Sequence, residues 1–401
     1  VREMIRNVYK ECKGVPKSNC LTKEQRLSLQ MDEFMNRRYE FRYNTQIGEV
    51  EYRERFSFQF YFHPIDKRAQ NSIMLDAQSE GIGVWDRDID RYLHSNRVPI
   101  YNPLEEFLFH LPHWDGKDRI HALANRVPCN NPHWELLFHR WFLNMVSHWR
   151  GVDKMHANNT SPILVGAQGT HKSTFCREMI PPALRAYYTD SIDFSQKRDA
   201  ELYLNRFALI NIDEFDQITL PQQGFLKHIL QKPVVNLRKP HGRSVLELQR
   251  YASFIGTSNQ KDLLTDPSGS RRFICIEVTG NIDTTQPIDY EQLYAQAMHE
   301  IYHGERYWFD SEDEQIMTEN NREFEQTPAM LQLFYQYFKA AQTKEEGEFL
   351  TPVEILNYLK KKSGISLSDN KVYHFGRLLQ KCGIASKHTY KGTVYQVIRI
   401  S

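Results

Sequence analysis

The sequence predicts an α/β protein built on a largely parallel sheet. Three apolar segments that end in polar residues favour this class: SPILV before a glycine-containing loop, FALINI before Asp213-Glu214, and SFIGTS before Asn259. Continuous apolar runs of this length are typical of strands covered on both faces. In such sheets ligands bind at the carboxyl ends of the strands, so these polar residues are the first candidates for a site.

The loop after the first of these strands, GAQGTHKS, precedes a helical stretch, TFCREMI, and is close to a phosphate-binding loop. Such loops direct backbone N–H groups and a helix N-terminus at a β-phosphate. Lys172 would then reach the β/γ-phosphates, and the Ser173 hydroxyl would ligate Mg²⁺. The residues expected to contact the nucleotide are Gly166, Ala167, Gln168, Gly169, Thr170, His171, Lys172, Ser173 and Thr174.

His171 departs from the pattern G-x-x-x-x-G-K-[ST], which has Gly immediately before the lysine. Gly suits that crowded turn, but His tolerates a positive φ better than most residues, at a cost of about 1–3 kcal/mol. Gly166 and Gly169 still allow the backbone to approach a ligand closely. The alternative interpretation is a glycine-containing strand-to-helix turn with an exposed lysine.

Two further segments supply groups that a phosphate site needs. Asp213 is the candidate metal-coordinating carboxylate, and Glu214 is the candidate general base that polarises the attacking water. An acidic pair that merely ends a core strand is the alternative. Arg271 and Arg272, in DPSGSRRF, could stabilise transition-state charge on the nucleotide of an adjacent subunit, or could simply face solvent.

The segment VVNLRKPHGRSVLELQRY predicts a β-hairpin with a basic turn. Its cationic and imidazole side chains at or beside the tip are Arg238, Lys239, His241 and Arg243. Cationic tips of this kind bind the phosphate backbone of nucleic acids, which makes DNA the expected partner. A solvated surface hairpin is the alternative.

Charge is distributed unevenly along the chain. The whole sequence has a net charge of +1, whereas residues 349–401 carry nine Lys/Arg and two Asp/Glu, a local +7 that leaves −6 elsewhere. The order helix, helix, strand–turn–strand in this stretch fits a winged helix, with phosphate contacts at Lys371, Arg377 and Lys391. A winged helix that docks protein is the alternative.

Composition limits the location of the chain. Six cysteines without C-x-x-C pairing predict reduced thiols, and hence a cytoplasmic protein. No run of eighteen apolar residues is present, so no membrane span is expected. The start, VREMIRNVYK, lacks the apolar core of a signal peptide.

The 401 residues should form two or three domains, in five segments. We expect an accessory α+β region at 1–100, a helical region at 101–150 and the ATP-binding core at 151–285. A second helical region is expected at 286–345, and the basic winged-helix-like domain at 346–401.

Taken together, the motifs resemble a known family. The order of phosphate loop, Asp-Glu strand, basic hairpin and Asn-ended strand resembles superfamily-three helicases, an AAA+-like group from viral and mobile-element replication. More narrowly, NPLEEFLFHLPHWDGKDRI, GAQGTHKST, LINIDEFD and GSRRF resemble the virulence-associated protein E family of prophages, genomic islands and phage satellites. The resemblance covers residues 102–280 well and the flanks poorly.

This resemblance implies an AAA+-like P-loop ATPase core and DNA-dependent ATP hydrolysis with Mg²⁺ by a ring, usually a hexamer, in replication of a mobile element. It implies that Asn259 orients the water and the γ-phosphate, that Arg271 or Arg272 acts in trans, and that Lys239 and His241 contact DNA in a central channel. Two other functions stay open: an ATP-gated DNA-binding or initiation factor without unwinding, and an interaction module that holds no nucleotide.

Overall fold

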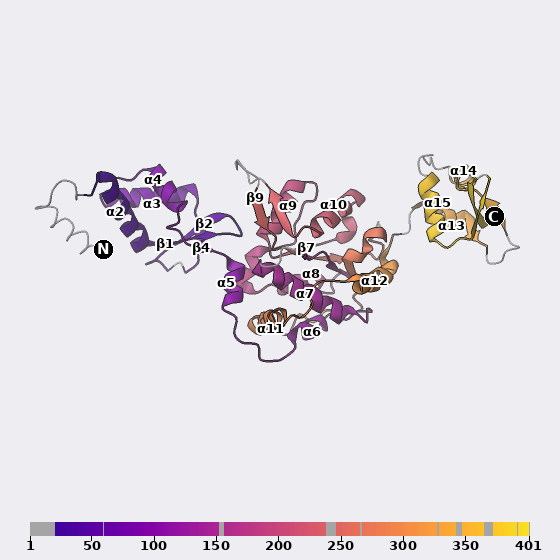
Figure 1. Ribbon diagram of the computed structural model, residues 1–401, viewed down its shortest axis with the longest axis horizontal. Helices are drawn as coiled ribbons and strands as arrows, with labels where there is room; N and C mark the ends of the chain where they lie inside the picture. The colour runs from indigo at the N-terminus through magenta and orange to yellow at the C-terminus, as the bar shows by residue number, and fades with distance from the viewer. Residues whose placement is uncertain are drawn as a thin grey trace, which may run out of the picture.

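The protein is described here by a computed structural model. It covers residues 21–400 except 59, 152–155, 238–245, 265–266, 327–328, 342–346, 365–371 and 391. Figure 1 shows three bodies that follow one another in chain order. Each has its own buried apolar cluster, and the central one has two, on opposite faces of its sheet. The mixed α/β class with a parallel sheet is confirmed.

In its described residues, 21–101 without 59, the N-terminal body contains a four-stranded sheet and three helices. Its elements are α2 (Lys23–Arg38), β1 (Tyr39–Asn44), β2 (Glu49–Glu54), β3 (His63–Pro64), α3 (Lys67–Ser79), α4 (Asp86–Leu93) and β4 (Ile100–Tyr101). The strand order is β3-β2-β1-β4, and β1 with β2 forms a hairpin that turns at residues 45–48. Gly48 has a φ of 71°, which a glycine adopts without strain in this turn.

The central body contains a five-stranded parallel sheet of order β11-β5-β10-β7-β6. Its strands are β5 (Ser161–Val165), β6 (Tyr188–Thr189), β7 (Leu209–Ile212), β10 (Ser253–Ser258) and β11 (Phe273–Glu277). Its helices are α5 (Pro103–Phe109), α6 (Arg119–Ala124), α7 (Trp134–Arg150), α8 (Lys172–Glu178), α9 (Lys197–Arg206), α10 (Leu220–Leu230), α11 (Tyr290–Tyr302) and α12 (Ser311–Asn320), with short 3₁₀ turns η2 (Pro182–Tyr187), η3 (Phe215–Gln217), η4 (Pro267–Arg272) and η5 (Asn321–Phe324).

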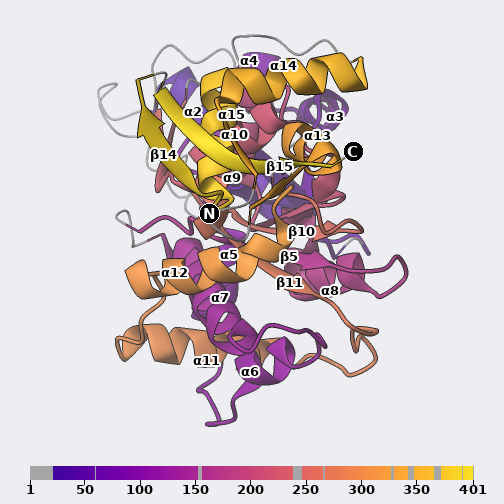
Figure 2. The same cartoon turned by 90° about the vertical axis from the view of Figure 1, so that its right-hand side faces the viewer.

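Helices cover both faces of this sheet, which is why its strands are continuously apolar. Leu164 packs into the cluster formed with α7, α8 and α11, whereas its neighbours Ile163 and Val165 pack into the cluster formed with α9 and α10. Figures 1 and 2 show α7 and α11 on one side of the sheet, and Figure 1 shows α9 and α10 on the other. The three apolar runs are therefore strands of one sheet, as predicted.

The helix α7 is more deeply buried than its sequence predicts. The aromatic residues of 134–145 suggest one buried stripe, but almost every residue from Trp134 to Trp149 is buried. The reason is its position, because α7 contacts β5 and β11 on one side and α6 and α11 on the other. Packing on both sides removes the solvent-facing surface that an amphipathic helix retains.

The antiparallel hairpin β8 (Val234–Leu237) and β9 (Leu246–Gln249) lies between α10 and β10 in the chain, as predicted. Its register pairs Val234 with Gln249 and Leu237 with Leu246. The tip that carries Arg238, Lys239, His241 and Arg243 lies outside the described residues.

The C-terminal body contains α13 (Ala329–Tyr337), β12 (Phe338–Ala340), β13 (Glu348–Leu350), α14 (Pro352–Ser363), α15 (Val372–Lys381), β14 (Ser386–Thr389) and β15 (Gly392–Arg399). The predicted order of helix, helix, strand, strand is present in α14 to β15. The prediction that residues 286–345 are helical is wrong at Phe338–Ala340, which form a strand because β15 offers them a free edge. None of the described helices has the length and apolar character that crossing a bilayer requires.

Candidate functional site

The loop between β5 and α8 adopts two left-handed backbone conformations. Gly169 has a φ of 85° and His171 a φ of 64°, so the chain takes at His171 the turn for which Gly is usually needed. His171 therefore lies in the left-handed turn that this position of the motif requires. At Gly166, an added Cβ would lie 2.9 Å from the Val278 carbonyl oxygen, so only glycine fits without a shift of β11 or the loop.

The Lys172 ammonium is held inside this loop. Its Nζ donates to the carbonyl oxygens of Gly166 at 2.7 Å and Ala167 at 2.8 Å, and to the Asn259 Oδ1 at 3.2 Å. Burial lowers the pKa of the ammonium, and the charge of Asp213 opposes that shift. Within the described part of the chain, no carboxylate oxygen lies within 4 Å of this nitrogen. The positive charge is thus held in place by neutral acceptors and remains available to an anion.

A second group of contacts joins the loop to the ends of β7 and β10. The Asp213 Oδ1 accepts a hydrogen bond from the Ser173 Oγ at 3.0 Å and another from the Thr257 Oγ1. The first pair is the predicted metal pair. Sequence reasoning missed Thr257, although its polar side chain near the end of an apolar strand, two residues before Asn259, is a usable signal.

Glu214 also occupies a left-handed conformation, with a φ of 53°. It lines a cavity of about 320 Å³ together with Asp213, Asn259 and the loop residues 168–174. A neighbouring cavity of about 180 Å³ is lined by Asp213 and Glu214 as well, together with Gln217 and Gln222. Glu214 therefore stands where the two cavities meet. A non-glycine residue in this conformation stores about 1–3 kcal/mol of strain, which is common at functional sites.

The chain topology explains why these segments meet. From β5 the chain leaves toward β6 at one edge of the sheet, and from β10 it crosses over β5 to β11 at the other edge. The two adjacent strands β5 and β10 therefore send their following loops in opposite directions. Such a reversal opens a crevice at the carboxyl ends of the strands, which is where α/β folds bind ligands. Lys172 and Asn259 lie in that crevice.

Several predicted residues are not part of this cavity. Arg271 and Arg272 lie in the 3₁₀ turn η4, not in an open loop, and the Arg271 Nη1 donates to the Glu314 Oε2 at 2.9 Å. Neither arginine lines the cavity of Lys172. Arg377 lies on α15, where its Nη2 donates to the Tyr373 hydroxyl at 2.9 Å. Lys371 and Lys391 lie outside the described residues.

Comparison with known families identifies the central body. Residues 108–326 match the virulence-associated protein E-like domain, a span that exceeds half of the chain. The chain belongs to the virulence-associated protein E-like family. Residues 327–397 match a second family, a domain of unknown function called DUF3874. The resemblance inferred from four sequence segments is thereby confirmed at the level of the family.

Beyond these families, this virulence-associated protein E-like chain has distant structural neighbours. No curated protein matches it. The apo structure of the NrS-1 C-terminal region is similar at 11% identity and a TM-score of 0.47, over 93% of this chain and 98% of that one. An A-form apo structure of the same region is similar at 11% identity and a TM-score of 0.45, over 93% and 98%.

Proposed function

We propose that this protein binds ATP with Mg²⁺ at the loop of residues 166–173 and hydrolyses it in response to DNA. The observation that carries the proposal is the Lys172 ammonium, held by two loop carbonyls and Asn259 in a cavity that Asp213 and Glu214 also line. Three chain segments far apart in sequence supply these groups. Their meeting supports an active site more strongly than any single motif does, because a lysine in a simple exposed turn has no need of such partners.

The donor set fits Mg²⁺. Ser173 and Asp213 offer a hydroxyl and a carboxylate within 3.0 Å of each other, and hard cations prefer oxygen ligands. Mg²⁺ usually takes one or two protein ligands and completes its shell with water and phosphate oxygens, so these two residues are enough. When bound, the ion would neutralise charge on the β- and γ-phosphates.

The remaining residues have roles that follow from their positions. Lys172 would bind the phosphates that face the cavity, exchanging its loop carbonyls for phosphate oxygens. Glu214 would accept the proton of the attacking water, and Asn259 would orient that water and the γ-phosphate. Thr257 would hold the Asp213 carboxylate in place through the oxygen that Ser173 also contacts.

The family supports a coupled role on DNA. We propose that the hairpin of β8 and β9 contacts DNA through its basic tip, and that the C-terminal body is a DNA-binding winged helix using Lys371, Arg377 and Lys391. Arg271, which lies outside its own chain's cavity, would act on the nucleotide of an adjacent subunit in a ring. The biological output would be translocation or unwinding during replication of a mobile element.

The first experiment measures ATP hydrolysis with and without single-stranded DNA for the wild type and for Lys172→Ala. DNA-stimulated turnover that disappears in Lys172→Ala is the expected result. The matched control is Lys67→Ala, which removes an exposed lysine in the N-terminal body whose nearest carboxylate, that of Asp86, is 3.7 Å away. Unchanged turnover in Lys172→Ala would overturn the proposal.

One observation favours a second candidate, an ATP-gated DNA-binding or initiation factor without unwinding activity. His171 occupies the left-handed turn with a side chain where Gly is usual, and this conformation stores strain. A strand-displacement assay separates the two functions. ATP binding without displacement, together with a gain of displacement in His171→Gly, would support the second candidate.

A further inference from the structure

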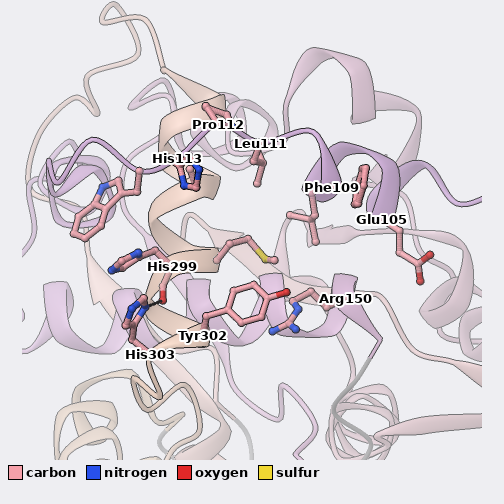
Figure 3. Close-up of a pocket in the computed structure, with 13 residues that line it drawn as sticks. Glu105, Phe109, Leu111, Pro112, His113, Arg150, His299, Tyr302 and His303 are labelled. Atoms are coloured by element: carbon pink, nitrogen blue, oxygen red, sulfur yellow. Dashed lines mark hydrogen bonds between the residues drawn. The ribbon is translucent and has the colours of Figure 1, made fainter.

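A third cavity, of about 580 Å³, lies between α5, the segment that follows it, the end of α7 and α11 (Figure 3). Its volume lies in the range of small-molecule sites. Its aliphatic lining is Leu108, Leu111, Pro112, Ala295 and Met298. Its remaining lining is aromatic, imidazole and charged, and the two charged residues are Glu105 and Arg150. This cavity contains none of the residues assigned to ATP.

Aromatic and imidazole side chains form one wall of the cavity. The Trp114 and His299 ring centroids are 4.9 Å apart, and the His299 and His303 rings are stacked with centroids 3.9 Å apart. Tyr302 and Phe109 are 67% and 83% exposed, although both are large aromatic residues. Figure 3 shows Phe109, His299, Tyr302 and His303 among the side chains that line the cavity. Open aromatic faces around a cavity are suited to stacking with a planar ligand.

The cavity also contains a cation, Arg150. The Arg150 guanidinium lies over the Tyr302 ring, 4.4 Å from its centroid. Among the described residues, no carboxylate oxygen lies within 4 Å of it, whereas nearby arginines are paired: Arg119 with Asp115 and Arg140 with Asp313. A planar guanidinium that is fixed against a ring, and that no carboxylate of the described residues contacts within 4 Å, is well placed to bind a phosphate.

The wall that carries Trp114 is held in place before any ligand binds. Gln292 of α11 makes two hydrogen bonds to the segment of residues 113–115. Its Oε1 accepts from the Asp115 N–H at 2.9 Å, and its Nε2 donates to the His113 carbonyl at 3.0 Å. The Trp114 Nε1 donates to the Lys117 carbonyl at 2.9 Å, and Arg119 binds Asp115 through two hydrogen bonds. Preorganisation of this kind lowers the entropy that a ligand must lose on binding.

The cavity lies at the opposite end of the sheet from the ATP site and close to the hairpin of β8 and β9. The end of α7 lies at the amino ends of the strands, since the Trp149 Nε1 donates to the Ala208 carbonyl just before β7. The phosphate loop lies at the carboxyl ends. The Gln249 Nε2, at the end of β9, donates to the His148 carbonyl at 3.1 Å, two residues before Arg150. The cavity is therefore next to the stem of the basic hairpin.

We propose that this cavity binds one nucleotide unit, with the base stacked against the exposed rings and the phosphate on Arg150. The unit is presented by single-stranded DNA passing the hairpin or as a free mononucleotide, which share this chemistry. The histidines offer ring nitrogens to the base edge, and the stack tolerates any base because every base has a π-face. The proposal rests on DNA binding in the proposed function, but not on ATP hydrolysis.

The test measures binding of a fluorescein-labelled oligothymidylate by anisotropy, and of thymidine monophosphate by calorimetry, both without ATP. Tyr302→Ala should weaken binding roughly tenfold, the loss of one stacked base, whereas Tyr302→Phe should retain it. Arg150→Gln should also weaken binding and reduce the salt slope of oligonucleotide binding by about one, which a merely structural change would not do. Arg91→Gln, which removes an arginine that is 76% exposed on α4, is the matched control.

The outcomes are distinct. Losses in the oligonucleotide arm assign the site to a single strand, and losses in the mononucleotide arm assign it to a free nucleotide. Wild-type affinity in Tyr302→Ala and Arg150→Gln, with DNA still bound, would overturn the proposal while leaving the ATPase and its DNA partner standing. Repeating the series in Lys172→Ala distinguishes binding at this cavity from binding at the ATP site. Crosslinking of a 5-bromouracil strand to Trp114 gives an independent readout of binding at the cavity. Because Tyr302 is exposed, its replacement does not threaten the fold.

Discussion

Replacing Arg250 with methionine should destabilise the central body strongly. Arg250 is fully buried, and within the described residues its guanidinium donates only to main-chain carbonyls. The four shortest bonds reach Leu230 at 2.7 Å, Lys232 at 2.8 Å, Ala252 at 2.9 Å and Asn158 at 2.9 Å. Burial lowers its pKa to about 9, so the side chain remains charged at neutral pH. It thus supplies partners to carbonyls at the end of α10 that the helix itself cannot satisfy.

The size of the effect follows from these contacts. Each buried carbonyl left without a donor costs about 1–3 kcal/mol. The substitution also removes the cost of burying a charge, which returns several kcal/mol to the free energy of unfolding of the variant. Methionine keeps most of the apolar stem, so little cavity is created. We expect the free energy of unfolding of the central body to fall by about 3–5 kcal/mol.

The assay is urea unfolding followed by tryptophan fluorescence, since Trp141 and Trp149 are fully buried in α7 of the central body. The control is Arg126→Met, because among the described residues Arg126 likewise donates to main-chain carbonyls, those of Gln286 and Pro287, but near the surface. That variant should lose about 1 kcal/mol or less. An Arg250→Met protein as stable as Arg126→Met would refute the reasoning that the buried carbonyls depend on this guanidinium.

Three further predictions concern the two sites. Thr257→Val removes a charge-assisted hydrogen bond from Asp213 and should raise the apparent Kd for Mg²⁺-ATP about tenfold in a calorimetric titration, whereas Thr257→Ser should not. Gly166→Ala would place its Cβ 2.9 Å from the Val278 carbonyl and should lower stability by about 1–3 kcal/mol in a thermal melt, whereas Gly83→Ala, with no atom within 4 Å, should not. Arg119 holds the pKa of the Asp115 carboxyl well below its usual range. The stabilisation by Asp115 is therefore present above its ordinary pKa of 3.8 and lost as the pH falls below it. The hydrogen-exchange protection factors of residues 110–118, which are corrected for the intrinsic pH dependence of exchange, should fall in acid, and Asp115→Asn should remove that dependence.

The local chemistry of the phosphate loop could be predicted from sequence. Glycine at 166 and 169, lysine at 172 and serine at 173 mark the turn, because each residue type is needed for its own backbone freedom or donor group. The strands carrying Asp213 and Asn259 could be predicted as well, since a strand covered on both faces must be apolar along its whole length. The virulence-associated protein E-like family could also be predicted from these segments.

Only the tertiary structure decided which of these groups meet. Local sequence carries no information on strand order, so the contact of Thr257 with Asp213 and of Lys172 with Asn259 became visible only once β5, β10 and β7 lay side by side. The same holds for the cavity of Arg150 and Tyr302, whose walls come from α5, α7 and α11. Sequence specified the chemistry of each residue, because that depends on the side chain and its near neighbours. Packing specified the partners, because buried contacts join segments separated by many residues.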